Sequence, residues 1–155
     1  MRVGRRIAVM GIAVAAAAAA GLVWFAVPVI AQSGDTFTAR LAWVPTTVRD
    51  RANVTGSGSV TARLSGTTLS IDGTFEGLAA PATAARLHEG VALGARGPAF
   101  HDLTIARAAS GAITGSVTLT SAQIDSLRAG KVYVQVHSEK GTDDDGSNLW
   151  GWLLR

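Results

Sequence analysis

Apolar and polar residues alternate in short stretches of the chain beyond residue 35. In residues 36–43, Phe37, Ala39, Leu41 and Trp43 fall on one face, and polar or small residues fall on the other. Successive side chains of a strand point to opposite sides, so this period of two predicts a strand with one buried face. The same pattern predicts further short strands at 60–64, 68–78, 84–88, 99–105, 113–119, 132–137 and 149–154.

One segment near residue 120 departs from the alternation. Thr120 and Gln123 have the Thr-x-x-Gln spacing of a capping box, Ile124 and Leu127 supply an apolar side, and Gly130 provides a stop. These features predict a helix of two to three turns that leads into the next strand. About eight short strands with one helical connection predict an all-β fold, an antiparallel sandwich or barrel.

The start of the chain has a different pattern. Arginines stand at positions 2, 5 and 6, and a continuous apolar run, 7–27, follows them. Val29 and Ala31 then occupy the −3 and −1 positions of a signal-peptide cleavage site. The apolar run is also long enough to span a bilayer as an uncleaved anchor helix, so both fates stay open. Residues 1–31 are therefore expected to be a signal peptide or membrane anchor, and 36–155 an extracytoplasmic domain, periplasmic or secreted.

Charge and cysteine content narrow the function of that domain. Three of the 14 basic residues lie in the leader, so the rest of the chain has 11 basic and 11 acidic residues and no net charge. A neutral domain argues against a nucleic-acid partner, and membrane contact is expected only through 7–27 if the leader stays attached. The absence of cysteine excludes disulfides, thiol catalysis and a lipid-bearing cysteine at the cleavage site.

Three stretches of the sequence resemble a known family. The first is FEGL (75–78) together with AARLHEG (84–90), the second is LRAGKVYVQVHS (127–138) and the third is NLWGWL (148–153). They are similar to the Gly-Leu…Ala-Ala-His-Ile-His-x-Gly, Leu-x-x-Gly-x-x-Tyr-Val-Asn-Val-His-Thr and Glu-Ile-Arg-Gly-Gln-Leu stretches of the CHRD domain, a module named from chordin that also occurs in exported bacterial proteins. The resemblance extends in register from about Thr36 to the C-terminus.

The CHRD resemblance implies an immunoglobulin-like or related β-sandwich and a non-catalytic module. Three positions depart from the family pattern. Arg86 replaces the first histidine of the His-x-His, and Trp150 and Trp152 replace the arginine and glutamine that flank the late glycine. An activity carried by those family residues would be absent from this chain.

Two histidines are the clearest candidate pair. His88 and His137 each end a predicted strand, and His101 lies beside Asp102. Imidazoles with a carboxylate such as Asp102 or Glu89 are suitable ligands for Zn²⁺ or Cu²⁺. The spacing is not that of a metal motif, however. The simpler interpretation is that His88 and His137 hydrogen-bond backbone carbonyls and fix the adjoining loops.

The loop 141–148 contains three adjacent aspartates, and oxygen ligands in a glycine-bent loop suit Ca²⁺. It lacks the alternating ligands and terminal glutamate of an EF-hand, so a solvated hairpin loop is the expected structure and a calcium site is not expected. A serine hydrolase is not expected either, because 56–59 lacks the Gly-x-Ser-x-Gly spacing of a nucleophile turn.

Two tryptophans near the C-terminus are a candidate binding surface. Trp150 and Trp152 are two residues apart on a predicted strand and share a face, while Leu149 and Leu153 take the other. If the leucines fill the core, both indoles lie outside, where paired aromatics mark a site for a glycan, a partner protein or a membrane interface. If the tryptophans fill the core, no such site exists.

The sequence therefore supports two functions. The first is a non-catalytic extracytoplasmic binding or structural module without a cofactor, which contacts a protein or glycan through Trp150, Trp152 and Arg86. The alternative is a periplasmic Zn²⁺- or Cu²⁺-binding protein that uses His88 and His137, with His101 as a further ligand.

Overall fold

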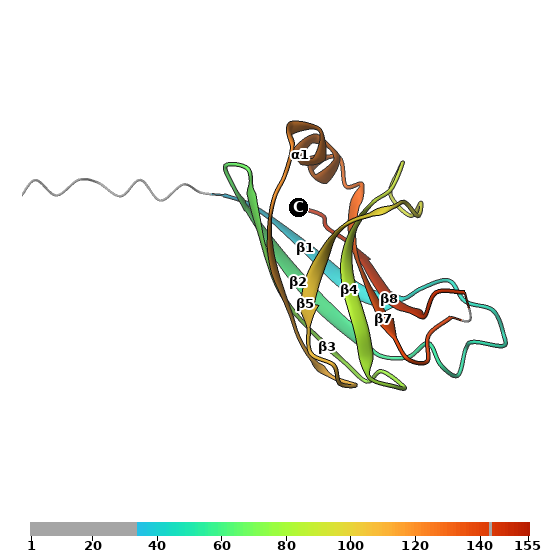
Figure 1. Cartoon of the computed structure of the whole chain (residues 1–155). Coiled ribbons are helices and arrows are strands. Elements are labelled where there is room, and N and C mark those ends of the chain that lie inside the picture. The colour runs from blue at the N-terminus through green and yellow to red at the C-terminus, as the bar shows by residue number, and fades with distance from the viewer. Residues whose placement is uncertain (1–33, 143) are drawn as a thin grey trace, which may run out of the picture. The chain divides into compact units, whose positions relative to one another are not determined.

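The computed structural model describes residues 34–142 and 144–155, so the expected leader, 1–31, lies outside the described residues (Figure 1). The described part contains eight strands and one helix. Each strand expected from the alternation is present, and the bounds differ only at the ends. The elements are β1 (Asp35–Trp43), β2 (Ser57–Ser65), β3 (Thr68–Glu76), β4 (Ala82–Glu89), β5 (Ala99–Ile105), β6 (Gly111–Thr118), α1 (Ser121–Arg128), β7 (Val132–Ser138) and β8 (Ser147–Trp152).

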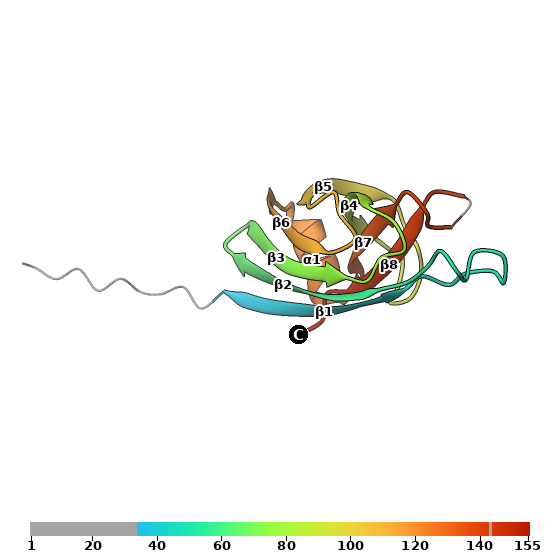
Figure 2. The ribbon, with the colours of Figure 1, turned by 90° about the horizontal axis from the view of Figure 1, so that it is seen from below.

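The strands close into one antiparallel barrel, so the prediction of a β-sandwich is wrong. The order around the barrel is β1-β2-β3-β6-β5-β4-β7-β8, and β8 returns to β1 (Figure 2). Two short contacts complete the ring, because β5 pairs with β6 at Thr104 and Ile105 and β8 pairs with β1 at Trp150 and Leu149. Alternation along a strand is the same in a sandwich and a barrel. The difference comes from these inter-strand pairings.

Two connections run across the ends of the barrel instead of joining neighbours. β3 is bonded to β6, and β4 lies between β5 and β7, so the β3–β4 and β6–β7 connections each pass other strands. This is a Greek-key arrangement. The helix α1 lies in the β6–β7 connection at one end of the barrel (Figure 1).

The helix begins as the sequence predicts. The Thr120 side chain accepts a hydrogen bond from the Gln123 backbone N–H, and the Gln123 side chain accepts one from the Thr120 N–H. Gly130, with φ of +69°, follows the helix in a conformation that favours glycine. Leu127 is fully buried and anchors α1 to the barrel core. None of the described helices is long and apolar enough to cross a membrane.

Inward-pointing residues of all eight strands form the core. β3 shows the alternation most clearly, with Leu69, Ile71 and Phe75 buried between exposed polar neighbours. Leu149 of β8 and Leu153 just beyond it are also fully buried in this core. Burial of such side chains contributes about 1.5–3 kcal/mol each and is the main source of stability in a chain without disulfides.

Trp43 is an exception to the predicted buried face of the first strand. Its side chain is 58% exposed, whereas Phe37 and Leu41 of the same face are buried. Trp43 is the last residue of β1, where the chain leaves the barrel. Its indole N–H donates a hydrogen bond of 2.8 Å to the Gly56 carbonyl, which holds the exposed ring in place.

Candidate functional site

The outward side of β7 is buried, although it points away from the barrel core. Val132, Val134 and Val136 point inward, so Tyr133, Gln135 and His137 point outward. These three are nevertheless only 0%, 2% and 6% exposed. A second packed layer therefore covers this part of the barrel surface.

Aromatic side chains from β4 and β8 form that layer. The Tyr133 ring centroid lies 4.4 Å from that of Trp152, 6.0 Å from that of Trp150 and 4.9 Å from that of His88. The two indole centroids are 6.1 Å apart. We call His88, Tyr133, His137, Trp150 and Trp152 the aromatic–histidine cluster.

The position of the cluster decides between the two interpretations of the C-terminal strand. Leu149 and Leu153 fill the core, and Trp150 and Trp152 share the outward side. The indoles are half-buried, because both pack against Tyr133. They therefore form an aromatic surface that is supported from below by Tyr133, with part of each indole exposed.

Loop residues frame the cluster on two sides. The Gly97 N–H donates to the Tyr133 hydroxyl at 3.1 Å, and that hydroxyl donates back to the Gly97 carbonyl at 3.2 Å. The Arg96 guanidinium lies 5.7 Å from the Trp150 ring centroid, within cation–π range. Arg96 Nη1 is also 3.9 Å from Asp145 Oδ2, so the loop after β4 reaches the loop before β8.

Both cluster histidines bind backbone carbonyls, as the simpler interpretation predicts. His88 Nδ1 lies 2.9 Å from the Gly97 oxygen, and His137 Nδ1 lies 3.1 Å from the Asp145 oxygen. A carbonyl accepts only, so each Nδ1 carries the proton and each Nε2 keeps a lone pair. His137 Nε2 lies 3.5 Å from the Gln135 amide nitrogen, which also donates to Ser147 Oγ. His88 Nε2 is buried and has no hydrogen-bond partner among the described residues.

The two imidazoles approach each other from distant backbone positions. His88 pairs with Tyr133 and His137 pairs with Ala84, so the two positions are four residues apart along the ladder. That offset corresponds to about 13 Å along a strand, yet the ring centroids are 6.5 Å apart. The side chains therefore converge above Arg86 and Gln135, which occupy the intervening row.

Burial lowers the pKa of His88 below its ordinary value of 6.5. Electrostatic repulsion by Arg86, and by His137 in its charged form, acts in the same direction, while the Gly97 hydrogen bond and the Asp145 carboxylate partly oppose it. The lowered pKa favours the neutral form of the His88 imidazole in the folded protein, and this form keeps the Nε2 lone pair.

Stability is expected to fall as the pH drops below about 6.5, because the unfolded chain binds the His88 proton more readily than the folded protein does. The loss begins below the ordinary histidine pKa and is complete below the lowered folded-state pKa. Urea unfolding between about pH 8 and about pH 5 should show a smaller fall in His88→Gln than in the unsubstituted protein. His101→Ala should keep the full pH dependence of the free energy of unfolding. An equal fall in His88→Gln and in the unsubstituted protein would contradict the assignment of this pH dependence to His88.

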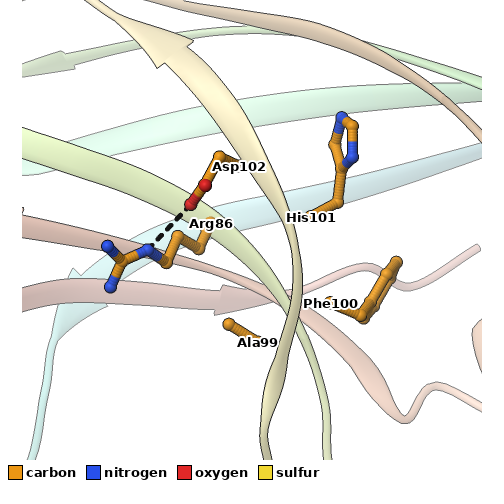
Figure 3. Close-up of a pocket in the computed structure, with 5 residues that line it drawn as sticks. All are labelled: Arg86, Ala99, Phe100, His101 and Asp102. Carbon is orange, nitrogen blue, oxygen red and sulfur yellow. Dashed lines mark hydrogen bonds and ion pairs between the residues drawn. The ribbon is translucent and has the colours of Figure 1, made fainter.

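Arg86 lies beside the cluster, on the outward side of β4, in the row that pairs with Gln135. Arg86 Nε donates to Asp102 Oδ1 at 2.8 Å across β4 and β5; the Asp102 side chain is largely exposed and the Arg86 side chain is half-buried. Figure 3 shows His101 and Phe100 pointing to the side of β5 opposite this ion pair. The five residues Arg86, Ala99, Phe100, His101 and Asp102 line an open depression of about 590 Å³.

His101 does not join the other two histidines. Across residues 34–142 and 144–155, no group of three or more His, Cys, Asp or Glu side chains is arranged to hold a metal ion. The pairing of β4 with β5 explains this separation, because the partner of His101 is Leu87, whose side chain points into the core, whereas His88 points outward. A β-bulge follows this pair, so that Ala99 takes the position opposite His88.

The aspartate loop is tied together by its own hydrogen bonds. Asp145 Oδ1 accepts from the Thr142 hydroxyl and the Ser147 N–H, both at 2.9 Å. Burial raises the pKa of Asp145, but the hydrogen bonds from Ser147 and Thr142 outweigh it and leave the pKa below its usual range. The adjacent Asp143 lies outside the described residues.

Several residues of this site were not expected from the sequence. Tyr133 and Gln135 lie on the outward side of β7 and were visible in principle, because they alternate with three valines. Arg96, Gly97 and Ser147 had no local signal, since their contacts depend on how two loops fold over the barrel.

The fold and the site define a class: a small Greek-key β-barrel domain with an aromatic and histidine layer on its outer surface. The family model of the CHRD domain matches residues 37–143, more than half of the chain. The chain therefore belongs to the CHRD domain family. The matched range includes His88, Tyr133 and His137 and ends before β8, so Trp150 and Trp152 lie beyond it. Comparisons with curated proteins and with solved structures gave no significant match.

Proposed function

We propose that this CHRD domain is a non-catalytic binding module that works outside the cytoplasm. The order of basic, apolar and small residues in 1–31 supports export. The module's contact surface for a glycan or a protein partner consists of Trp150 and Trp152, the part of the aromatic–histidine cluster that reaches the surface. Arg86, in the adjoining row, completes this contact surface. The observation that carries the proposal is the packing of both indoles on Tyr133, at 6.0 and 4.4 Å.

This packing favours binding for a physical reason. An aromatic side chain that is already fixed loses little conformational entropy when a ligand covers it. Trp150 is fixed by Tyr133 on one side and Arg96 on another. Indole faces pack on sugar rings and on apolar side chains alike, and a nearby guanidinium adds hydrogen-bond donors.

The surface can be tested with a double substitution, Trp150→Ala/Trp152→Ala. Binding of the purified protein to an immobilised panel of oligosaccharides, and to proteins from the same extracytoplasmic fraction, is measured for each variant. For any ligand bound by the unsubstituted protein, we expect the double variant to lose at least about tenfold in affinity, the usual scale for central interface aromatics.

Trp43→Ala is the matched control, because Trp43 is an exposed indole outside the cluster. Its affinity should stay within about twofold of the unsubstituted protein. Full affinity in the double variant, or a greater loss in Trp43→Ala, would show that the ligand binds elsewhere.

Metal binding in the same compartment is a second candidate function, and one observation favours it. His88 is 9% exposed and its Nε2 atom has no hydrogen-bond partner among the described residues. Buried nitrogens without partners are uncommon in proteins, and a bound ion would satisfy this one.

A further inference from the structure

We propose that His88 and His137 bind one copper ion through their Nε2 atoms, on the outward side of β4 and β7. This inference rests on the second candidate function, since it specifies the ligand atoms and the metal. It is independent of whether Trp150 and Trp152 contact a glycan or a protein.

The hydrogen bonds of the two imidazoles prepare them as ligands. Each Nδ1–H donates to a backbone carbonyl, that of Gly97 for His88 and that of Asp145 for His137. Metal-binding histidines commonly donate the other ring N–H in this way, which fixes the tautomer and the ring orientation. Both Nε2 lone pairs are left for an ion.

The separation of the rings is close to that of two imidazoles on one ion. A metal–nitrogen bond of about 2.0–2.1 Å, extended by roughly 1 Å to each ring centre, gives a centroid separation of up to roughly 6 Å. The observed separation is 6.5 Å, with the ring planes 27° apart; it slightly exceeds that limit, so the two rings must move toward each other when the ion binds. His137 would exchange its 3.5 Å contact with the Gln135 amide for the ion, while Gln135 keeps its partner Ser147.

The small number of protein ligands favours copper over zinc. Structural zinc sites use four protein ligands and catalytic ones use three, whereas the described residues provide no group of three His, Cys, Asp or Glu side chains. Imidazole suits Cu²⁺, which binds nitrogen sites more tightly than the other divalent ions of its row. Water would complete the coordination of the ion.

The tryptophans next to the two histidines provide a fluorescence signal for copper binding. The His88 ring stacks on Tyr133, and Tyr133 contacts both Trp150 and Trp152. A copper ion between the histidines would lie close to these indoles and quench their fluorescence, whereas zinc, which has a filled d shell, would quench little.

The test uses the full chain purified without an affinity tag, because a polyhistidine tag would itself bind copper. Cu²⁺ and Zn²⁺ are titrated separately, with tryptophan fluorescence and metal analysis after dialysis as readouts. We expect one Cu²⁺ per chain, bound at least about tenfold more tightly than Zn²⁺, with nitrogen hyperfine structure in the electron paramagnetic resonance spectrum. His88→Ala/His137→Ala should lose this binding.

His101→Ala is the matched control, because it removes the third histidine of the chain outside the cluster. It should bind one Cu²⁺ as the unsubstituted protein does. Near-ultraviolet circular dichroism shows whether the double variant is folded. If it is not, the single variants His88→Gln and His137→Gln replace it, each with an expected affinity loss of at least about tenfold.

Three results would overturn the proposal: no stoichiometric copper, copper binding that survives in folded variants lacking His88 or His137, or zinc binding tighter than copper. Trp150→Ala/Trp152→Ala should still bind copper, detected by metal analysis. Loss of partner binding in that variant without loss of copper separates the two proposals, so each can fail alone.

Discussion

Replacing Tyr133 by alanine is expected to reduce the free energy of unfolding by about 3–5 kcal/mol, the cost of removing a large aromatic side chain from a core. The side chain points away from the barrel interior, but it is fully buried. Its ring contacts His88, Trp150 and Trp152. Alanine would leave a cavity between them and the strand.

Urea unfolding followed by far-ultraviolet circular dichroism measures this loss. Arg63→Ala is a suitable control, because Arg63 points outward from β2 and is exposed, and its expected change is within about 0.5 kcal/mol. Tyr133→Phe should cost less than alanine, since it keeps the ring and removes only the hydroxyl bonded to Gly97. A cost below about 1 kcal/mol for Tyr133→Ala would mean that the aromatic–histidine cluster adds no stability.

Elements that depend on neighbouring residues were predictable from the sequence. The alternation in 68–78 reflects one buried and one exposed face, and the structure has that face buried in β3. The capping box at Thr120 and Gln123 involves residues three positions apart, so the sequence contains everything needed to place α1. The CHRD resemblance was confirmed over residues 37–143.

Features that depend on distant pairings were not predictable. Barrel closure requires β8 to pair with β1, more than a hundred residues earlier in the chain, through Trp150 and Leu149, with a further bridge from Leu154 to Thr38. Exposure of Trp43 has the same origin, since its position in the alternation gives no sign that the barrel ends there.

The site was predictable in its residue types and not in its geometry. Two histidines and two tryptophans stood out in the sequence, and the structure brings His88, His137, Trp150 and Trp152 into one cluster. His101 is separated from the other two because it pairs with the core residue Leu87 and so lies on the other face of the sheet from His88. The burial of the outward side of β7 depends on side chains of β4 and β8 and on two loops, whose contacts with β7 have no sequence period.

Gly97→Ala is expected to destabilise the domain by about 1–3 kcal/mol, the usual cost of forcing extra volume into a packed site. A Cβ at Gly97 would overlap the Glu89 carbonyl and lie 2.9 Å from Gly90 Cα. Both are backbone atoms and cannot turn aside as a flexible side chain would. The loop would shift instead, and the Gly97 bonds to His88 and Tyr133 would be lost with it.

The loss of those bonds distinguishes Gly97→Ala from an ordinary loop substitution. Nuclear magnetic resonance of the His88 ring should show a changed Nδ1 environment, because its carbonyl partner has moved. Gly94→Ala, in the same loop, is the control. A Cβ there meets open space, and the positive φ of +82° alone costs about 1–2 kcal/mol. The His88 signal should stay unchanged in Gly94→Ala, and an unchanged signal in Gly97→Ala would mean that this loop does not position His88.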